Sequence, residues 1–88
     1  MRIAISGAQF RRDVRRAQKR GKDMAKLRQV ILLLVEERPL PYRYQDHPLS
    51  GEWSHHRDCH LEPDWVLIYK VEGRELYLVR TGTHSDLF

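Results

Sequence analysis

Four of the five histidines lie between residues 47 and 60, and the only cysteine, Cys59, lies among them. The segment "RDCHLEPDW", residues 57–65, adds two aspartates to this group. Histidine exchanges protons near neutral pH because its reference pKa is about 6.5. These residue types suit acid–base catalysis, metal binding or thiol chemistry, and the elements that carry them decide which side chains meet.

The segment that contains Asp58 and His60 is expected to be a strand. Side chains two residues apart on a strand share a face, so Asp58 and His60 point to one side while Arg57 and Cys59 point to the other. Pro63 then forces a turn, and Asp64 begins the next strand. We therefore expect Asp58, His60 and Asp64 to gather at one end of a β-hairpin.

Such a group on an open sheet face suits the cleavage of RNA. Without a metal, this reaction needs a base for the 2′-hydroxyl proton, an acid for the leaving 5′-oxygen, and a cation near the phosphate. Histidine can serve as base and as acid. Any single histidine is also compatible with an ordinary surface role, so the clustering is what favours catalysis.

Metal binding and thiol catalysis are the rival interpretations. His56, Cys59 and His60 could supply zinc ligands, but the chain has one cysteine and no CxxC pair. Cys59 should also face away from His60, and nothing fixes a basic partner beside it. We predict no metal site and no cofactor.

The size and composition of the chain limit what can carry this group. With 88 residues, 41% hydrophobic and 32% charged, the chain is expected to fold as one domain, residues 1–88. A net charge of +4 and a pI near 9.6 favour anionic partners. The longest apolar run, residues 30–35, is too short to span a membrane, and we expect a soluble, cytoplasmic protein without a membrane partner.

The hydrophobic pattern predicts a helical half followed by a strand half. We expect a short strand at residues 1–5, a helix from Ser6 that ends at Gly21, and a second helix at 22–37. A proline-rich loop at 39–51 precedes strands at 52–61, 64–71 and 74–81, and a short tail closes the chain. The prediction is an α+β fold, ordered β-α-α-β-β-β, with two N-terminal helices packed on one face of a small antiparallel sheet.

More than half of the lysines and arginines lie between Arg11 and Arg28, in the predicted helices. They form either a solvated helix face or a surface that binds phosphates without reading sequence. Exposed aromatic residues could stack on bases, and the terminal Phe88 is the most suggestive of them.

The motifs "DHPL", "RDCHLEPDW" and "TGTHSDLF", in this order, resemble the YafQ branch of the RelE/ParE superfamily of bacterial toxins. The segment "AQFRRDVRRAQKRGKDMAKL" is also similar to the helical half of that branch, so the resemblance spans nearly the whole chain. It implies a RelE-like fold and the toxin of a type II toxin–antitoxin system.

The resemblance also implies the residues of the site. The catalytic group would be His47, His60, Asp64 and His84, with His84 the general acid and the other three sharing base and orienting duties. Supporting or substrate-binding roles would fall to Asp58, Trp65 and Phe88, while Arg57 and Arg80 are candidates for phosphate charge. His55 and His56 lie outside the motifs.

The implied activity is a ribosome-dependent endoribonuclease that cleaves messenger RNA by metal-independent catalysis and inhibits translation. The expected partners are the ribosome, mRNA and a cognate antitoxin, through which operator DNA would mainly be bound. The alternative is a non-enzymatic toxin, such as a gyrase-directed member of the ParE branch, or a basic RNA-binding module. Codon preference, the identity of the antitoxin and the stoichiometry of their complex do not follow from the sequence.

Overall fold

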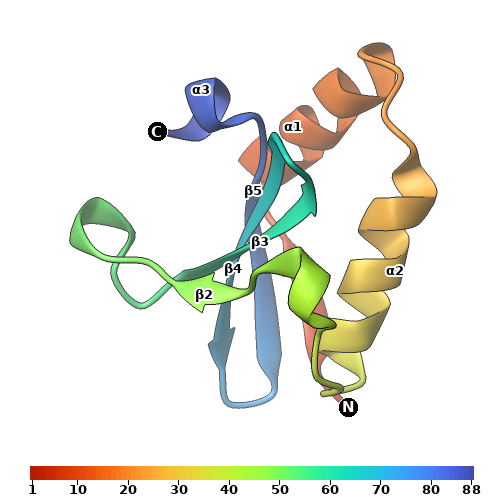
Figure 1. The fold of residues 1–88 in the computed structure, drawn as a ribbon. Helices are drawn as coiled ribbons and strands as arrows, with labels where there is room; N and C mark the ends of the chain where they lie inside the picture. The colour runs from red at the N-terminus through yellow and green to blue at the C-terminus, as the bar shows by residue number, and fades with distance from the viewer.

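The computed structural model describes residues 1–88 as a mixed sheet with two long helices on one face (Figure 1). The helical elements are α1 (Ala8–Lys19), α2 (Met24–Val35), the 3-10 turns η1 (Tyr42–Tyr44) and η2 (Gly51–Trp53), and α3 (His84–Leu87). The strands are β1 (Ile3–Ser6), β2 (His47–Pro48), β3 (Arg57–Glu62), β4 (Trp65–Glu72) and β5 (Glu75–Gly82). The predicted α+β fold with two N-terminal helices on the sheet is confirmed.

The five strands lie in the order β1-β5-β4-β3-β2. The strands from β2 to β5 pair antiparallel, whereas β1 runs parallel to β5. A parallel pair needs a long crossover, which α1 and α2 supply. Strand β4 is central and buried on both faces over Trp65–Tyr69, as its β-branched and aromatic sequence leads one to expect.

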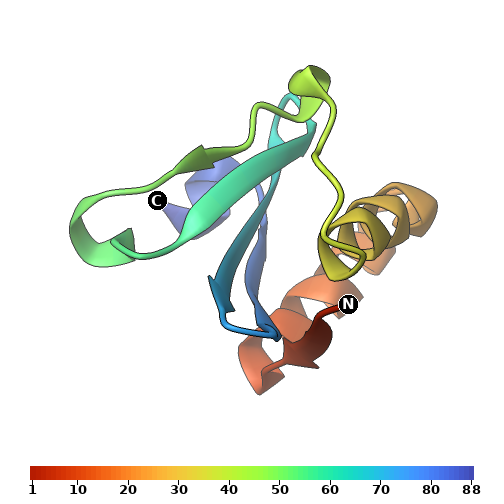
Figure 2. The same ribbon diagram turned by 90° about the horizontal axis from the view of Figure 1, so that it is seen from below.

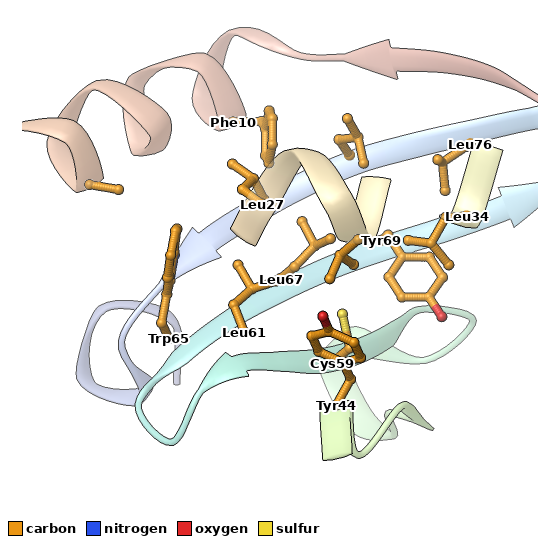
Figure 3. Close-up of a cluster of buried hydrophobic side chains, with 13 residues drawn as sticks. Phe10, Leu27, Leu34, Tyr44, Cys59, Leu61, Trp65, Leu67, Tyr69 and Leu76 are labelled. Carbon is orange, nitrogen blue, oxygen red and sulfur yellow. The ribbon is translucent and has the colours of Figure 1, made fainter. Parts of the chain in front are cut away.

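The main hydrophobic core lies between the helices and the sheet (Figure 3). The apolar stripe of α1 places Phe10 and Ala17 in this core, and the wider stripe of α2 adds Leu27, Val30 and Leu34. The sheet contributes side chains from the same face of three strands: Cys59, Leu61, Trp65, Leu67, Tyr69, Leu76 and Leu78. Burial of this face fixes the strand register, and therefore which side chains point to the opposite face.

The start of α1 differs from the sequence prediction. Ser6 does not cap α1; it is the last residue of β1, paired with Leu78, and Gly7 is the N-cap. The parallel pairing with β5 holds Ser6 in the sheet, so the helix begins at Ala8. The predicted left-handed stop after α1 is confirmed, because Gly21 has φ +81°.

The C-terminal tail forms the short helix α3, which the prediction missed. The side chain of Thr83 accepts from the backbone N–H of Asp86, and the side chain of Asp86 accepts from the backbone N–H of Thr83. This capping box has its sequence signal in "THSD", a threonine followed three residues later by an acidic residue.

The face of the sheet opposite α1 and α2 is not fully open, which corrects the expected bare surface. A small cluster of Val66, Ile68 and Leu87 covers part of it, with Leu49, Trp53 and Val79 packed against it. Figure 2 shows α3 on the side of the sheet away from the two long helices. No helix in the structure is both long and apolar enough to cross a bilayer.

Candidate active site

Three histidines from distant parts of the chain meet on the face opposite the long helices. His47 in β2 is the cross-strand partner of Asp58 in β3, and His60 lies two residues further along β3 on the same face. His84 begins α3 and comes to the same place from the end of β5. The rings of His60 and His84 are 5.4 Å apart between centroids, and those of His47 and His60 are 6.2 Å apart.

The carboxylate of Asp64 orients His84. Oδ1 of Asp64 lies 2.7 Å from Nδ1 of the His84 ring and also accepts the His84 backbone N–H at 2.9 Å. These two contacts lower the pKa of Asp64, the backbone hydrogen bond most, so the carboxylate stays ionised at neutral pH. Nδ1 of His84 therefore donates to Asp64, and Nε2 remains free for a substrate.

His47 lies between two hydrogen-bond acceptors. Its Nδ1 is 2.7 Å from the carbonyl oxygen of Gln45 and must carry a proton there, because a carbonyl only accepts. Its Nε2 is 3.1 Å from Oδ1 of Asp58. His47 is therefore positioned from both sides of its ring.

Asp58 is 3% exposed and lies beneath the three rings. Burial raises its pKa, and the charges of His47, His60 and His84 oppose this shift. Oδ1 of Asp58 receives no aligned hydrogen bond, although Nε2 of His47 lies 3.1 Å from it. Asp58 is thus a buried acid that couples to all three histidines without reaching solvent.

His60 occupies the middle of the group. No hydrogen bond joins its ring to another protein group, and its neighbours are the edges of the His47 and His84 rings. The side chains of His47 and His84 are about half exposed, and that of Asp64 more so. The group is therefore open to a large ligand and offers His60 as an unengaged base.

The two arginines predicted to supply phosphate charge are engaged elsewhere. Arg57 forms two hydrogen bonds of 3.2 Å with Asp46, and Arg80 binds the buried Asp13 of α1 at 2.7 Å. These ion pairs occupy both guanidinium groups away from the histidines. Phosphate binding by Arg57 or Arg80 stays a prediction, and it would have to compete with these ion pairs.

The two predicted aromatic contacts have different outcomes. Trp65 is 1% exposed, packs in the main core (Figure 3) and donates its indole N–H to Thr81, so it has no free face for a base. Phe88 is 58% exposed, and its ring lies 6.1 Å from that of His84. Phe88 can thus stack on a base beside the histidines, whereas Trp65 only supports the turn that carries Asp64.

Cys59 points into the main core, opposite the histidines, as the strand periodicity predicts. Burial raises the pKa of its thiol, which disfavours the reactive thiolate. No three His, Cys, Asp or Glu side chains converge closely enough to hold a metal ion.

Comparison with known proteins places the chain in a family. Residues 2–88 match the family described as bacterial toxin of type II toxin–antitoxin system, YafQ. The chain belongs to this family. It is 53% identical to the mRNA interferase toxin YafQ of Escherichia coli K12 over 87 residues, which cover 98% of this chain and 94% of that protein.

Solved structures of relatives share the fold over the whole chain. YafQ in the E. coli DinJ–YafQ complex superposes with a TM-score of 0.93 at 49% identity, covering 100% of this chain and 99% of that one. A metal-bound toxin from Helicobacter pylori gives a TM-score of 0.93 at 39% identity, with both chains fully covered. The RelE-like fold expected from the YafQ motifs agrees with these neighbours.

Several residues that shape the YafQ-type site of this chain were missed from the sequence. Asp46 holds Arg57 and also accepts a hydrogen bond from Tyr69, and Gln45 adopts a left-handed backbone (φ 50°) that aims its carbonyl at His47. The sequence offered a signal for Asp46, because it directly precedes His47 in the motif "DHPL". The left-handed turn at Gln45 has no such signal, because nothing in its residue type requires it.

Proposed function

We propose that this chain is the toxin of a type II toxin–antitoxin system and an endoribonuclease that cleaves messenger RNA on the ribosome. The observation that carries the proposal is the convergence of His84, oriented by Asp64, with His60 and the His47–Asp58 pair on one exposed surface. Family membership and the name mRNA interferase of the 53%-identical relative support the same activity.

The proposed reaction is transfer of the phosphodiester to the adjacent 2′-hydroxyl, without a metal. His60 accepts the proton of the 2′-hydroxyl, the 2′-oxygen attacks phosphorus, and the bond from phosphorus to the 5′-oxygen breaks. His84 donates a proton from Nε2 to that leaving oxygen. The products are a 2′,3′-cyclic phosphate and a 5′-hydroxyl, and each histidine ends in the protonation state in which the other began.

Asp64 and the His47–Asp58 pair act through the two catalytic rings. Asp64 keeps the proton of His84 on Nδ1 and stabilises the imidazolium from which His84 donates. His47, which contacts Asp58 and the carbonyl of Gln45, lies beside His60 and shares in orienting it.

The proposed partners of the chain are an antitoxin, operator DNA and the ribosome. An antitoxin would bind and neutralise it, by analogy with the E. coli relative, which forms a toxin–antitoxin complex with DinJ. Operator DNA would be bound mainly through that antitoxin. Action in the cytoplasm is part of the proposal, since translating ribosomes are the proposed site of cleavage.

The test compares two histidine-to-asparagine variants expressed in growing bacteria. His84→Asn should abolish growth arrest and transcript cleavage, because at least a hundredfold of the rate depends on the general acid. His55→Asn is the matched control: His55 lies outside the site with a left-handed backbone (φ 69°) that asparagine tolerates, and it should stay toxic.

Equal toxicity of the two variants would overturn the enzymatic proposal. That outcome is what a gyrase-directed or purely RNA-binding toxin predicts, because neither needs a proton donor at His84. Mapping cleavage sites on a reporter transcript by primer extension, with translation on and off, separates ribosome-dependent cleavage from cleavage of free RNA.

A further inference from the structure

A hollow of about 390 Å³ adjoins the histidine group between η1 and the end of β3. Arg43, Tyr44 and Gln45 line one side, and His60, Glu62 and Pro63 line the other. Figure 2 shows η1 above the turn that joins β3 to β4. His60 belongs both to this hollow and to the histidine group. A ligand in the hollow would therefore lie beside His60 and close to His84, whose ring centroid is 5.4 Å from that of His60.

Arg43 differs from the arginines that were expected to supply phosphate charge. Arg57 and Arg80 bind Asp46 and Asp13, whereas no carboxylate lies within ion-pair distance of Arg43. Its charge is therefore not offset by a neighbouring acid.

The guanidinium group of Arg43 is nevertheless held in place. It lies over the ring of Tyr44, with 4.8 Å between the guanidinium carbon and the ring centroid, and Nη2 donates to the Tyr44 hydroxyl at 3.1 Å. Tyr44 itself is buried in the main core. A positioned guanidinium with remaining donors is suited to bind a phosphate through two parallel hydrogen bonds.

The one carboxylate that lines the hollow, that of Glu62, is paired with lysines and should not repel a bound phosphate. Glu62 is bound by Lys22 at 2.9 Å and by Lys26 at 2.8 Å, so its charge is offset from the helical side. The volume lies in the range of sites that take small ligands, and it can admit one nucleotide.

We infer that this hollow is a subsite for the nucleotide next to the scissile bond of RNA, with Arg43 binding its phosphate. The inference rests on the proposed function and names a substrate contact that the histidine group itself does not supply. Arg43 takes the role expected of Arg57 and Arg80, namely the cation that positions the RNA backbone.

The test is binding of a labelled 2′-O-methyl oligoribonucleotide of about ten nucleotides, measured by fluorescence anisotropy. This probe cannot be cleaved, so the assay does not depend on catalysis. Arg43→Gln removes the charge and keeps a donor for the Tyr44 hydroxyl, and Arg74→Gln is the control at the exposed turn between β4 and β5. Both variants lose one positive charge.

Arg43→Gln should weaken binding roughly tenfold and lower the slope of log affinity against log salt by about one, while Arg74→Gln changes affinity less than about twofold. Arg43→Lys should recover part of the affinity, because the charge returns without the fork of donors. Unfolding temperatures within a few degrees of the wild-type value show that the fold is intact.

Equal affinities of Arg43→Gln and Arg74→Gln would overturn the inference. An equal loss at Arg43 for a polyglutamate peptide of the same charge would also overturn it, in favour of an acidic protein partner. The proposed function is tested separately by cleavage, which His84→Asn should abolish, whereas the inference about Arg43 is tested by binding of the uncleavable oligonucleotide to the Arg43 and Arg74 variants.

Discussion

At the scale of single residues, the site combines two aspartates whose pKa values the fold shifts in opposite directions. Asp64 is exposed and held ionised by two contacts with His84, while Asp58 is buried and its pKa is raised. Groups whose surroundings push their pKa values apart commonly divide the roles of a catalytic site. In the proposed mechanism Asp64 orients the donor ring of His84, while Asp58 lies buried against His47.

Asp58→Asn should stabilise the fold and impair cleavage. The pKa of Asp58 in the folded chain lies above its unfolded value near 3.9, so stability falls as the pH rises through that range and remains lower at neutral pH. The amide has no charge to bury. We expect the unfolding temperature at pH 7 to rise by a few degrees, with the difference vanishing near pH 3.

Thermal unfolding monitored by circular dichroism at pH 7 and pH 3 measures this effect. Glu52→Gln, which removes a charge from an exposed position in η2, should leave the unfolding temperature unchanged at both values. A lower unfolding temperature of Asp58→Asn at pH 7 would show that ionised Asp58 stabilises the fold, contrary to this account.

At this scale, the sequence predicted the side-chain directions that follow from the two-residue alternation of a strand. Asp58 and His60 share a face and Cys59 opposes them because successive strand residues alternate. It did not reveal the aspartate partners of Arg57 and Arg80, which depend on tertiary packing: Asp13 is 67 positions from Arg80 in the sequence. A single sequence does not show such pairs.

At the scale of elements, α3 positions His84, the proposed general acid, and α1 positions α3. Asp86 closes the capping box with Thr83 and binds Arg20, the C-cap residue of α1, at 2.6 Å, with Arg16 3.6 Å away. Beneath them, Asp13 of α1 accepts the backbone N–H of Thr81, at the end of β5. The helical side of the molecule thus fixes the segment that carries His84.

Asp86→Asn should weaken this attachment. The hydrogen bond from Arg20 and those at Thr83 lower the pKa of Asp86, so its contribution is fully present above the unfolded value near 3.9 and is lost as the pH falls through the folded value. We expect the free energy of unfolding to fall by about 1 kcal/mol at pH 7, with a smaller difference near pH 2.

Urea unfolding at the two pH values tests this expectation. Asp23→Asn is the control, because Asp23 caps α2 through its side chain and asparagine caps equally well. A constant difference between wild type and Asp86→Asn from pH 7 to pH 2 would contradict the assigned ion pair.

The element boundaries show what local signals can and cannot decide. The two long helices were predictable from their apolar stripes. The short helix α3 also had a local signal, the capping-box pattern in "THSD", which the sequence prediction did not use. The parallel pairing of β1 with β5 was not predictable, because it depends on how the crossover of α1 and α2 packs. That pairing is also why Ser6 belongs to the sheet.

At the scale of the whole molecule, the sheet separates two surfaces with different chemistry. One side carries the basic helices, where Arg11, Arg12 and Arg15 have no acidic partner, and the other carries the histidines. On the histidine side, the hollow with Arg43 adjoins His60, and Phe88 lies beside His84. This arrangement suits an RNA strand that crosses the group, with the basic helices free for the surrounding ribosomal RNA or an acidic antitoxin.

The central claim is that the histidine group cleaves RNA through the 2′-hydroxyl next to the scissile phosphate. The direct measurement uses programmed ribosomes and an mRNA with a single 2′-deoxy substitution at the cleaved nucleotide, beside an mRNA with the substitution one nucleotide away. Only the first substitution should block cleavage, and the unmodified mRNA should yield 2′,3′-cyclic phosphate and 5′-hydroxyl ends. Cleavage at the deoxynucleotide, or products with 5′-phosphate ends, would contradict it.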